Sequence, residues 1–122
     1  MKRRVLIVDD EFGLAEVMGE LVSERGFVVS IAMNGKLALA DMEQNPPHLV
    51  LLDIMMPIMD GPTMLKRLRE EPRFSDIPVV LMSSLPQSAL SQLDGLYQAL
   101  VRKPFSPEVL YDLLDRYLPD SE

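Results

Sequence analysis

Short apolar runs alternate along the chain with stretches whose apolar residues recur at helical spacing. The clearest run is Leu49–Leu52, which is unbroken and stops at Asp53. A run of this kind is typical of a strand that is buried on both faces of a sheet. Pro57 and Gly61 follow and break regular structure, so Asp53 is expected to open onto a stiff loop. Aspartate is also common at turns, so this run alone leaves the role of Asp53 open.

Four further apolar runs predict strands. They are residues 4–9, 27–32, 79–83 and 97–102. Helical spacing predicts helices between them at residues 11–25, 36–44 and 61–70. A last helix is expected after Ser106, with an apolar face that extends to Leu118. Residues 86–95 offer a single turn of apolar spacing, so the fourth helix in chain order is expected to be short or irregular.

Residues with known preferences at helix ends mark several boundaries. Gly26 is a good C-terminal stop for the first helix. Asp60 can cap the helix that begins at residue 61, and Ser106-Pro107 is a strong start for the last helix. The predicted apolar face of the first helix consists of Leu14, Val17, Met18, Leu21 and Val22.

The alternation of five strand patterns with helical patterns predicts an α/β fold: a doubly wound parallel sheet with helices on both faces. The chain has 122 residues and shows no internal repeat, low-complexity tract or linker, so we expect a single domain over residues 1–122. Residues 120–122 read as a short polar tail, and no effector domain is recognisable after residue 118. Both a stand-alone domain and a piece of a longer regulator fit this pattern.

The composition narrows the class of protein. The net charge of −7 argues against a surface that binds nucleic acid. The chain has no cysteine, which excludes disulfides and thiolate metal sites. No apolar run approaches the length that spans a membrane, and the N-terminus does not resemble a signal peptide. A cytoplasmic protein is therefore the default expectation.

Chemically capable residues stand at the ends of four predicted strands. They are Asp9 and Asp10, Asp53, Ser83, and Lys103. In a doubly wound sheet the carboxyl ends of the strands lie on one edge, where such folds bind their ligands. Each residue has an ordinary alternative, such as a solvated acid at a helix start or a surface lysine. Together they predict one cleft that holds three carboxylates, a hydroxyl and an ammonium group.

Three carboxylates in close proximity repel one another, and a divalent cation would relieve that repulsion. Hard oxygen ligands favour Mg²⁺, with Mn²⁺ also possible, over zinc. A cation beside Lys103 and Ser83 also suits a phosphoryl group, because phosphoryl transfer needs mainly positioning and charge stabilisation. Asp53 would then be the nucleophile that forms an acyl phosphate.

At this point the residues resemble a known family, the receiver domains of two-component response regulators. The matching segments are Val8-Asp9-Asp10-Glu11, Asp53 through Met56-Pro57 to Asp60-Gly61, Ser83-Ser84 and Lys103-Pro104-Phe105. The resemblance extends from Val5 to Leu118, and the order and joint spacing of the segments make it specific. It implies a flavodoxin-like fold with sheet order 2-1-3-4-5.

The resemblance also implies a metal site. Asp10, Asp53 and the backbone carbonyl of Met55 would bind Mg²⁺ directly, and Asp9 would contribute through a water molecule. Asp53 would accept phosphate from a phosphohistidine on a sensor histidine kinase or a phosphotransfer protein. By the same resemblance the chain is a signalling phosphoacceptor that promotes its own phosphorylation and dephosphorylation, and is not an enzyme in the ordinary sense.

Ser83 and Lys103 would hold the phosphoryl group, and the Lys103–Pro104 peptide bond is commonly cis in the family. Two departures concern the response to phosphorylation. Leu100 stands where the family usually has an aromatic residue that swings inward, and the segment from Ser83 to Lys103 is slightly shorter than usual. The family's output face comprises the fourth helix, the fifth strand and the last helix, and would contact a downstream protein or a second copy.

Two other functions compete with a phosphoacceptor. A pseudo-receiver would use the same fold only to bind proteins. Leu100 and the shortened segment favour it, whereas the intact acids, Ser83 and Lys103 oppose it. A phosphohydrolase with an aspartyl nucleophile would need a general acid two residues after Asp53, where Met55 stands, and the chain has no cap domain for a substrate. His48 is expected to be a surface residue. The methionines near Asp53 are read as loop and core residues, with a partner-binding patch as the alternative.

Overall fold

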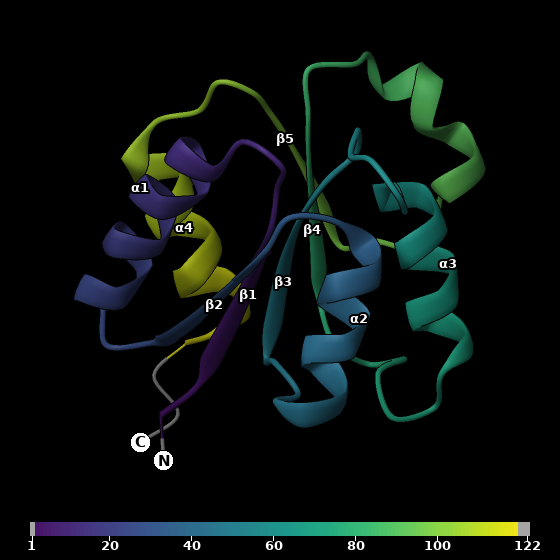
Figure 1. Ribbon diagram of the computed structural model, residues 1–122. Helices are drawn as coiled ribbons and strands as arrows, with labels where there is room; N and C mark the ends of the chain where they lie inside the picture. Colours follow the sequence, from purple (N-terminus) through teal and green to yellow (C-terminus); the bar gives the residue numbers. More distant parts are fainter. Residues whose placement is uncertain (1, 120–122) are drawn as a thin grey trace.

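The computed structural model describes residues 2–119, which form five strands, four α-helices and one 3₁₀ helix (Figure 1). The strands are β1 (Arg4–Val8), β2 (Val28–Ala32), β3 (Leu49–Asp53), β4 (Val79–Ser83) and β5 (Ala99–Arg102). The helices are α1 (Phe12–Glu24), α2 (Gly35–Gln44), α3 (Gly61–Glu70), the 3₁₀ helix η1 (Gln87–Leu93) and α4 (Pro107–Tyr117). The polar tail predicted for residues 120–122 lies outside the described residues.

All strands pair in parallel, in the order β2-β1-β3-β4-β5. The predicted doubly wound sheet and its order are therefore confirmed. The register aligns the carboxyl ends of the strands, since Asp53 pairs with Met82 and Ser83 pairs with Arg102. The chemically capable residues at these ends consequently share one edge of the sheet.

Helices cover both faces of the sheet. Figure 1 shows α1 and α4 on one side, and α2 and α3 on the other. Two apolar cores result, one beneath each helical layer. β3 and β4 lie in the middle of the sheet and are buried along their whole length, which explains their unbroken apolar sequence.

The buried face of α1 differs from the prediction. Leu14 and Val17 are exposed by 38% and 55%, whereas Ala15 and Gly19 face the core. The small residues allow α1 to lie close to the sheet: a Cβ on Gly19 would come within 3.3 Å of a methyl group of Val29. Leu14 and Val17 instead line a shallow apolar groove of about 170 Å³.

The helix ends follow the predicted signals. Asp60 accepts a hydrogen bond from the backbone N–H of Thr63 at 2.9 Å, and Ser106 accepts one from Val109 at 3.4 Å. Asn34 caps α2 in the same way, through the N–H of Leu37. Gly26 follows α1 with a φ of +94°, a conformation that glycine adopts without strain.

The segment between β4 and β5 is irregular, as expected. η1 is a 3₁₀ helix with non-helical dihedral angles at Leu90, and it buries Leu90 and Leu93. β5 begins at Ala99, two residues later than the predicted start at 97, and Leu96 and Tyr97 pack against the core ahead of the strand.

Arg69, near the end of α3, connects three segments at the opposite edge of the sheet from the strand carboxyl ends. Its guanidinium donates to the backbone carbonyls of Phe74, Ser75, Ile77 and Leu96, and to the side chain of Gln98. The same Gln98 oxygen accepts the N–H of Val79 at 2.6 Å. One side chain therefore donates hydrogen bonds to backbone carbonyls in two connecting segments, which lie outside the helices and strands.

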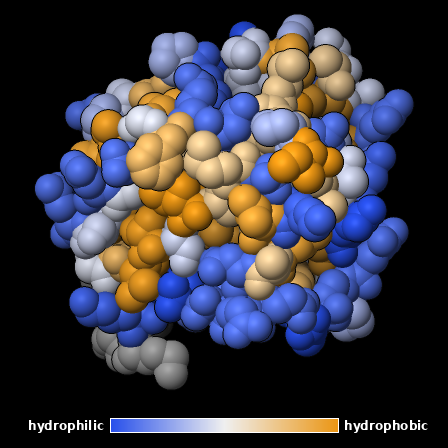
Figure 2. All heavy atoms as spheres, viewed as in Figure 1, coloured by the Kyte–Doolittle hydropathy of each residue, from blue (hydrophilic) through white to orange (hydrophobic). Residues whose placement is uncertain are grey.

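Part of the surface is apolar. Figure 2 shows hydrophilic residues around the periphery of one face of the molecule and apolar ones nearer its middle. Among the described residues, the most exposed large apolar side chain is Ile58, at 80%, followed by Met55 at 69%. Within residues 2–119, every helix is too short or too polar to cross a lipid bilayer.

Candidate functional site

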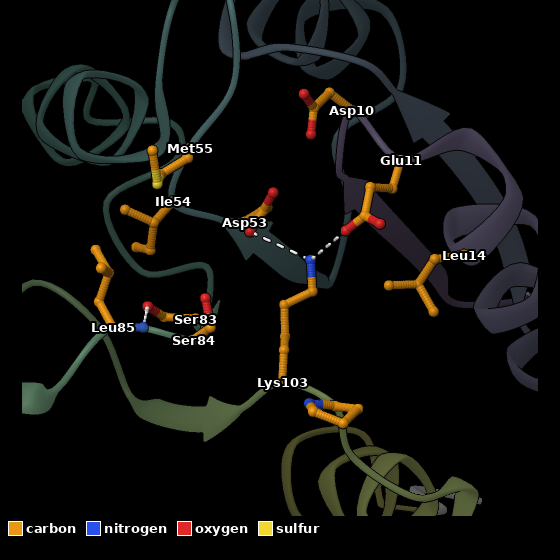
Figure 3. Close-up of a pocket in the computed structure, with 11 residues that line it drawn as sticks. Asp10, Glu11, Leu14, Asp53, Ile54, Met55, Ser83, Ser84, Leu85 and Lys103 are labelled. Carbon is orange, nitrogen blue, oxygen red and sulfur yellow. Dashed lines mark hydrogen bonds and ion pairs between the residues drawn. The ribbon is translucent and has the colours of Figure 1, made fainter.

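A cleft of about 440 Å³ opens at the carboxyl edge of the sheet. Asp53 ends β3 and Ser83 ends β4, and Lys103 directly follows β5. Asp10 comes from the segment after β1. Figure 3 shows these side chains around one opening, with Lys103 reaching up from below toward Asp53. The structure thus brings together the side chains that the sequence placed at the strand ends.

Lys103 is the positive centre of this cleft. Its Nζ lies 3.0 Å from Oδ2 of Asp9 and 3.4 Å from Oδ1 of Asp53. A third contact, also 3.4 Å, reaches Oε1 of Glu11. The peptide bond between Lys103 and Pro104 is cis, as the resemblance implied.

Asp9, Asp10 and Asp53 form an acidic cluster in which one carboxylate oxygen of each lies within 4.8 Å of the others. Asp9 is completely buried and Asp53 is 8% exposed, whereas Asp10 is open to solvent. Such a set of oxygen donors suits Mg²⁺, which keeps several waters and takes one or two carboxylates. The residues that are present therefore fit the predicted metal.

Asp53 is held in an unfavourable setting for a carboxylate. Burial and the nearby charge of Asp9 raise the pKa of Asp53 to about 6, although Lys103 and the Ile54 backbone oppose the rise. For Lys103, burial disfavours the charge, but the hydrogen bond with Asp9 and the charges of Asp53 and Asp9 outweigh it and raise the pKa of the ammonium group. Lys103 therefore stays protonated beside carboxylates that it only partly neutralises.

Ser83 is 2% exposed, and its Oγ accepts a hydrogen bond from the N–H of Leu85 at 2.8 Å. The hydroxyl proton remains able to donate, because a serine hydroxyl both accepts and donates. The neighbouring Ser84 also lines the cleft. Ser83 thus lies at the predicted place, with its oxygen anchored to the start of the next loop.

The loop from β3 to α3 is fixed by close backbone packing. The N–H of Gly61 donates to the carbonyl of Ile54 at 2.9 Å. A Cβ on Gly61 would lie 2.2 Å from the carbonyl oxygen of Asp53, so only glycine fits there. At the far side of the loop, the carbonyl of Met59 accepts the N–H of Gly35 at 2.9 Å. These contacts hold the backbone that carries Asp53.

The methionines of this loop divide into two kinds. Met56 and Met59 pack against the core, whereas Met55 is 69% exposed and lines the cleft. His48 is exposed, and its Nδ1 accepts the backbone N–H of Arg4 at the amino end of β3, the end opposite to the cleft. The predicted surface position of His48 is confirmed.

Glu11 is the cleft residue whose contact the sequence did not reveal. It belongs to the segment that carries the family resemblance, but no role followed from its position. The available signal was a third acid directly after the Asp9-Asp10 pair, at the start of a helix. Its partner Lys103 lies 92 residues further along the chain, so sequence spacing could not show the contact.

The perturbed Asp53 has a consequence for stability. In metal-free protein, Asp53→Asn should raise the free energy of unfolding at neutral pH. The pKa rises from 3.8 to about 6 on folding, so stability present at low pH is lost as the pH rises toward 6. The two proteins should be equally stable near pH 4 and differ by about 1–2 kcal/mol at pH 7, after allowance for solvent screening.

Urea denaturation with a chelator, at half-unit steps of pH, measures this difference. Subtraction of the Asp53→Asn curve from the wild-type curve removes the titration of all other groups. A difference that stays constant with pH would contradict the raised pKa.

Comparisons with known proteins agree with the fold. The model of the response regulator receiver domain matches residues 5–115. Sporulation initiation phosphotransferase F of Bacillus subtilis is 33% identical over 121 residues, which cover 98% of this chain and 96% of that protein. The chain therefore belongs to the response regulator receiver domain family of two-component signalling.

Longer relatives and solved structures extend this picture. A probable transcriptional regulator, ycf27, of Cyanophora paradoxa is 37% identical over 112 residues, which cover 89% of this chain and 45% of that protein. The chain thus spans less than half of the length of that curated relative. A receiver domain of a histidine kinase from Syntrophus aciditrophicus superimposes with a TM-score of 0.88 at 28% identity, covering 98% of this chain and 92% of that one.

The chemotaxis response regulator CheY4 of Vibrio cholerae has a TM-score of 0.90 at 24% identity and covers 97% of this chain and all of that one. At this identity the likeness concerns the fold alone.

Proposed function

We propose that this chain is a Mg²⁺-dependent phosphoacceptor that receives a phosphoryl group on Asp53. The donor is a phosphohistidine of a sensor histidine kinase or a phosphotransfer protein, in the cytoplasm. The observation that carries the proposal is the position of Asp53 at the mouth of the cleft, 3.4 Å from Lys103 and within 4.8 Å of two further carboxylates. The domain is taken to comprise residues 1–122.

In the proposed step, a carboxylate oxygen of Asp53 attacks the phosphorus atom of the phosphohistidine. A new O–P bond forms as the P–N bond breaks, and the imidazole nitrogen that leaves takes a proton from water. The products are an acyl phosphate on Asp53 and a neutral histidine. The chain supplies the nucleophile and its surroundings, which fits a signalling phosphoacceptor that promotes its own phosphorylation and dephosphorylation.

Asp10, Asp53 and the backbone carbonyl of Met55 would hold the Mg²⁺ ion, with Asp9 contributing through water. The ion supplies positive charge that offsets the carboxylates and the phosphoryl oxygens. Asp9 is buried and already accepts Lys103 and the N–H of Glu11, which supports an indirect role. Mn²⁺ would serve through the same oxygen ligands.

Lys103 and Ser83 would bind the phosphoryl oxygens. Lys103 donates from one side of the cleft as a charged group, which stabilises the charge that phosphoryl transfer concentrates there. Ser83 donates its hydroxyl proton from the end of β4, where its place at the cleft supports this role. Both side chains are largely buried, so their hydrogen bonds are weakly screened by solvent.

Phosphate uptake tests the proposal. The wild-type protein, incubated with acetyl phosphate and Mg²⁺, should gain the mass of one phosphoryl group, and Asp53→Asn should gain none, because the amide is not a nucleophile of this kind. Intact-mass spectrometry measures both. Asp60→Asn is the matched control, since Asp60 is an exposed carboxylate of the same loop, and it should be phosphorylated.

Three other results would replace the proposal. A wild-type protein that takes up no phosphate and does not bind beryllofluoride with Mg²⁺ would be a pseudo-receiver. Equal uptake by the wild type and Asp53→Asn would place the acceptor elsewhere. Sustained turnover of a small phosphate ester would indicate the phosphohydrolase that Met55 argues against.

The output face corresponds here to η1, β5 and α4, and we include it as the proposed contact for a downstream protein or a second copy. Leu100 is half-buried, pairs with Leu81 in the sheet and packs against the core beneath α3. It has no hydroxyl to exchange partners and less volume than an aromatic ring. The signal on this face would therefore depend more on Ser83 and the irregular η1 than on a swinging side chain.

A further inference from the structure

Three carboxylates surround the ammonium group of Lys103, and Figure 3 shows Asp53 and Glu11 on opposite sides of it. Nζ donates to Asp9 at 3.0 Å and to Glu11 and Asp53 at 3.4 Å each. An ammonium group has three N–H donors and accepts nothing. These three contacts use all of its donors, so a further acceptor must replace one of them.

Glu11 is the partner that can leave most easily. The exposed fractions of the three carboxylate side chains are 0% for Asp9, 11% for Asp53 and 66% for Glu11. Water can hydrate the Glu11 carboxylate when its ion pair with Lys103 breaks, and an exposed ion pair contributes little to stability. Separating Lys103 from the buried Asp9 would instead leave a charge without compensation.

The backbone of Glu11 is fixed, so its side chain alone can move. Oδ1 of Asp9 accepts the N–H of Glu11 at 2.9 Å, and the carbonyl of Glu11 accepts the N–H of Ala15 at 2.9 Å. Glu11 is also the N-cap residue of α1, but its side chain makes no capping hydrogen bond. The side chain contacts Lys103 rather than its own helix.

We infer, on the basis of the function proposed above, that Glu11 is a positioning residue that holds Lys103 in the unphosphorylated protein and releases it to the phosphoryl oxygens on Asp53. Glu11 and the phosphoryl group compete for the same N–H donor. Glu11 also adds a negative charge at the mouth of a cleft that must admit an anionic phosphoryl group. Both effects oppose phosphorylation, so Glu11 sets how readily the acceptor state forms.

Beryllofluoride with Mg²⁺ tests the competition. Glu11→Gln removes the charge and retains the shape, so the apparent affinity for beryllofluoride should rise about two- to fivefold, the size expected from a partly exposed ion pair. Glu16→Gln is the matched control: it removes the same charge from an exposed position of α1 that does not line the cleft. Its affinity should equal that of the wild type.

Exchange of the Lys103 ammonium protons with water tests the resting contact without metal or phosphodonor. Nitrogen-detected or proton NMR of the lysine ammonium groups should show exchange several-fold faster in Glu11→Gln than in the wild type or Glu16→Gln. The absence of the signal in Lys103→Arg assigns it. If Glu11 had a merely structural role, Glu11→Gln would lower the free energy of unfolding and leave the exchange rate of the Lys103 ammonium protons unchanged. We expect an unchanged free energy of unfolding and a faster exchange.

The outcomes separate this inference from the proposed function. A wild type that binds no beryllofluoride would overturn the proposed function and, with it, the release step. A wild type that binds beryllofluoride with the same affinity as Glu11→Gln would overturn the role of Glu11 alone, as would unchanged ammonium exchange. Weaker binding by Glu11→Gln would show that Glu11 assists the phosphoryl group instead of opposing it.

Discussion

Gly61→Ala should destabilise the protein by about 3 kcal/mol or more, a large part of the stability of a typical domain. The added Cβ would lie 2.2 Å from the carbonyl oxygen of Asp53 and 3.0 Å from the Cα of Ile54. Both neighbours are backbone atoms at the end of β3, which cannot rotate away as a side chain does. The strand end or the start of α3 must therefore shift.

The shift would also damage the cleft, because Asp53 carries the affected carbonyl. Gly61→Ala protein that still folds should bind Mg²⁺ and beryllofluoride at least tenfold more weakly than the wild type, as misplacement of a positioned group predicts. Urea denaturation measures the stability and calorimetric titration measures the affinity.

Gly13→Ala provides the control for the substitution itself. Gly13 lies in α1, and a Cβ there would meet nothing within 4 Å. Because alanine favours helices, this variant should gain about 0.5–1 kcal/mol. Equal effects of the two substitutions would show that close packing at Gly61 does not determine the strand end.

Lys103→Met should change three properties in different directions. Methionine retains the apolar stem and removes the charge, which leaves the buried Asp9 and the nearby Asp53 without a cation. Metal-free protein should lose about 2–3 kcal/mol of stability, somewhat less than for a completely buried ion pair. The affinity for Mg²⁺ should rise, because the ion then becomes the sole positive charge among these carboxylates.

Phosphorylation by acetyl phosphate should nevertheless slow by about 10²–10³-fold, the effect of removing one group that stabilises charge in the transition state. Lys66→Met removes the same charge from the exposed surface of α3 and should alter none of the three properties. Phosphorylation of Lys103→Met at the wild-type rate would remove Lys103 from the proposed chemistry.

Much of the site was predictable because it follows from topology. A parallel sheet aligns the carboxyl ends of its strands, so Asp53, Ser83 and Lys103 had to meet once five strands were recognised. The buried centre of the sheet was equally clear, since β3 and β4 are apolar at every position before their last residue.

Details that depend on close packing were harder to predict. The apolar spacing of Leu14 and Val17 suggested that they face the core, yet the core side of α1 is marked by the small residues Ala15 and Gly19. A hydropathy pattern predicts that large apolar residues are buried, but it contains no information on how closely a helix approaches the sheet. Contacts such as that of Glu11 with Lys103 depend on the folded geometry of residues far apart in the chain.

Arg69 has a consequence for how the domain tolerates sequence change. Its guanidinium serves the carbonyls of Phe74, Ser75, Ile77 and Leu96, none of which offers its side chain to the contact. The side chains of these connecting segments can therefore vary with little effect on the hydrogen bonds that hold their backbone. These hydrogen bonds depend instead on one arginine and its partner Gln98, while core packing separately constrains the side chains of Phe74, Ile77 and Leu96. Lysine cannot replace the arginine because it lacks the planar fork of donors.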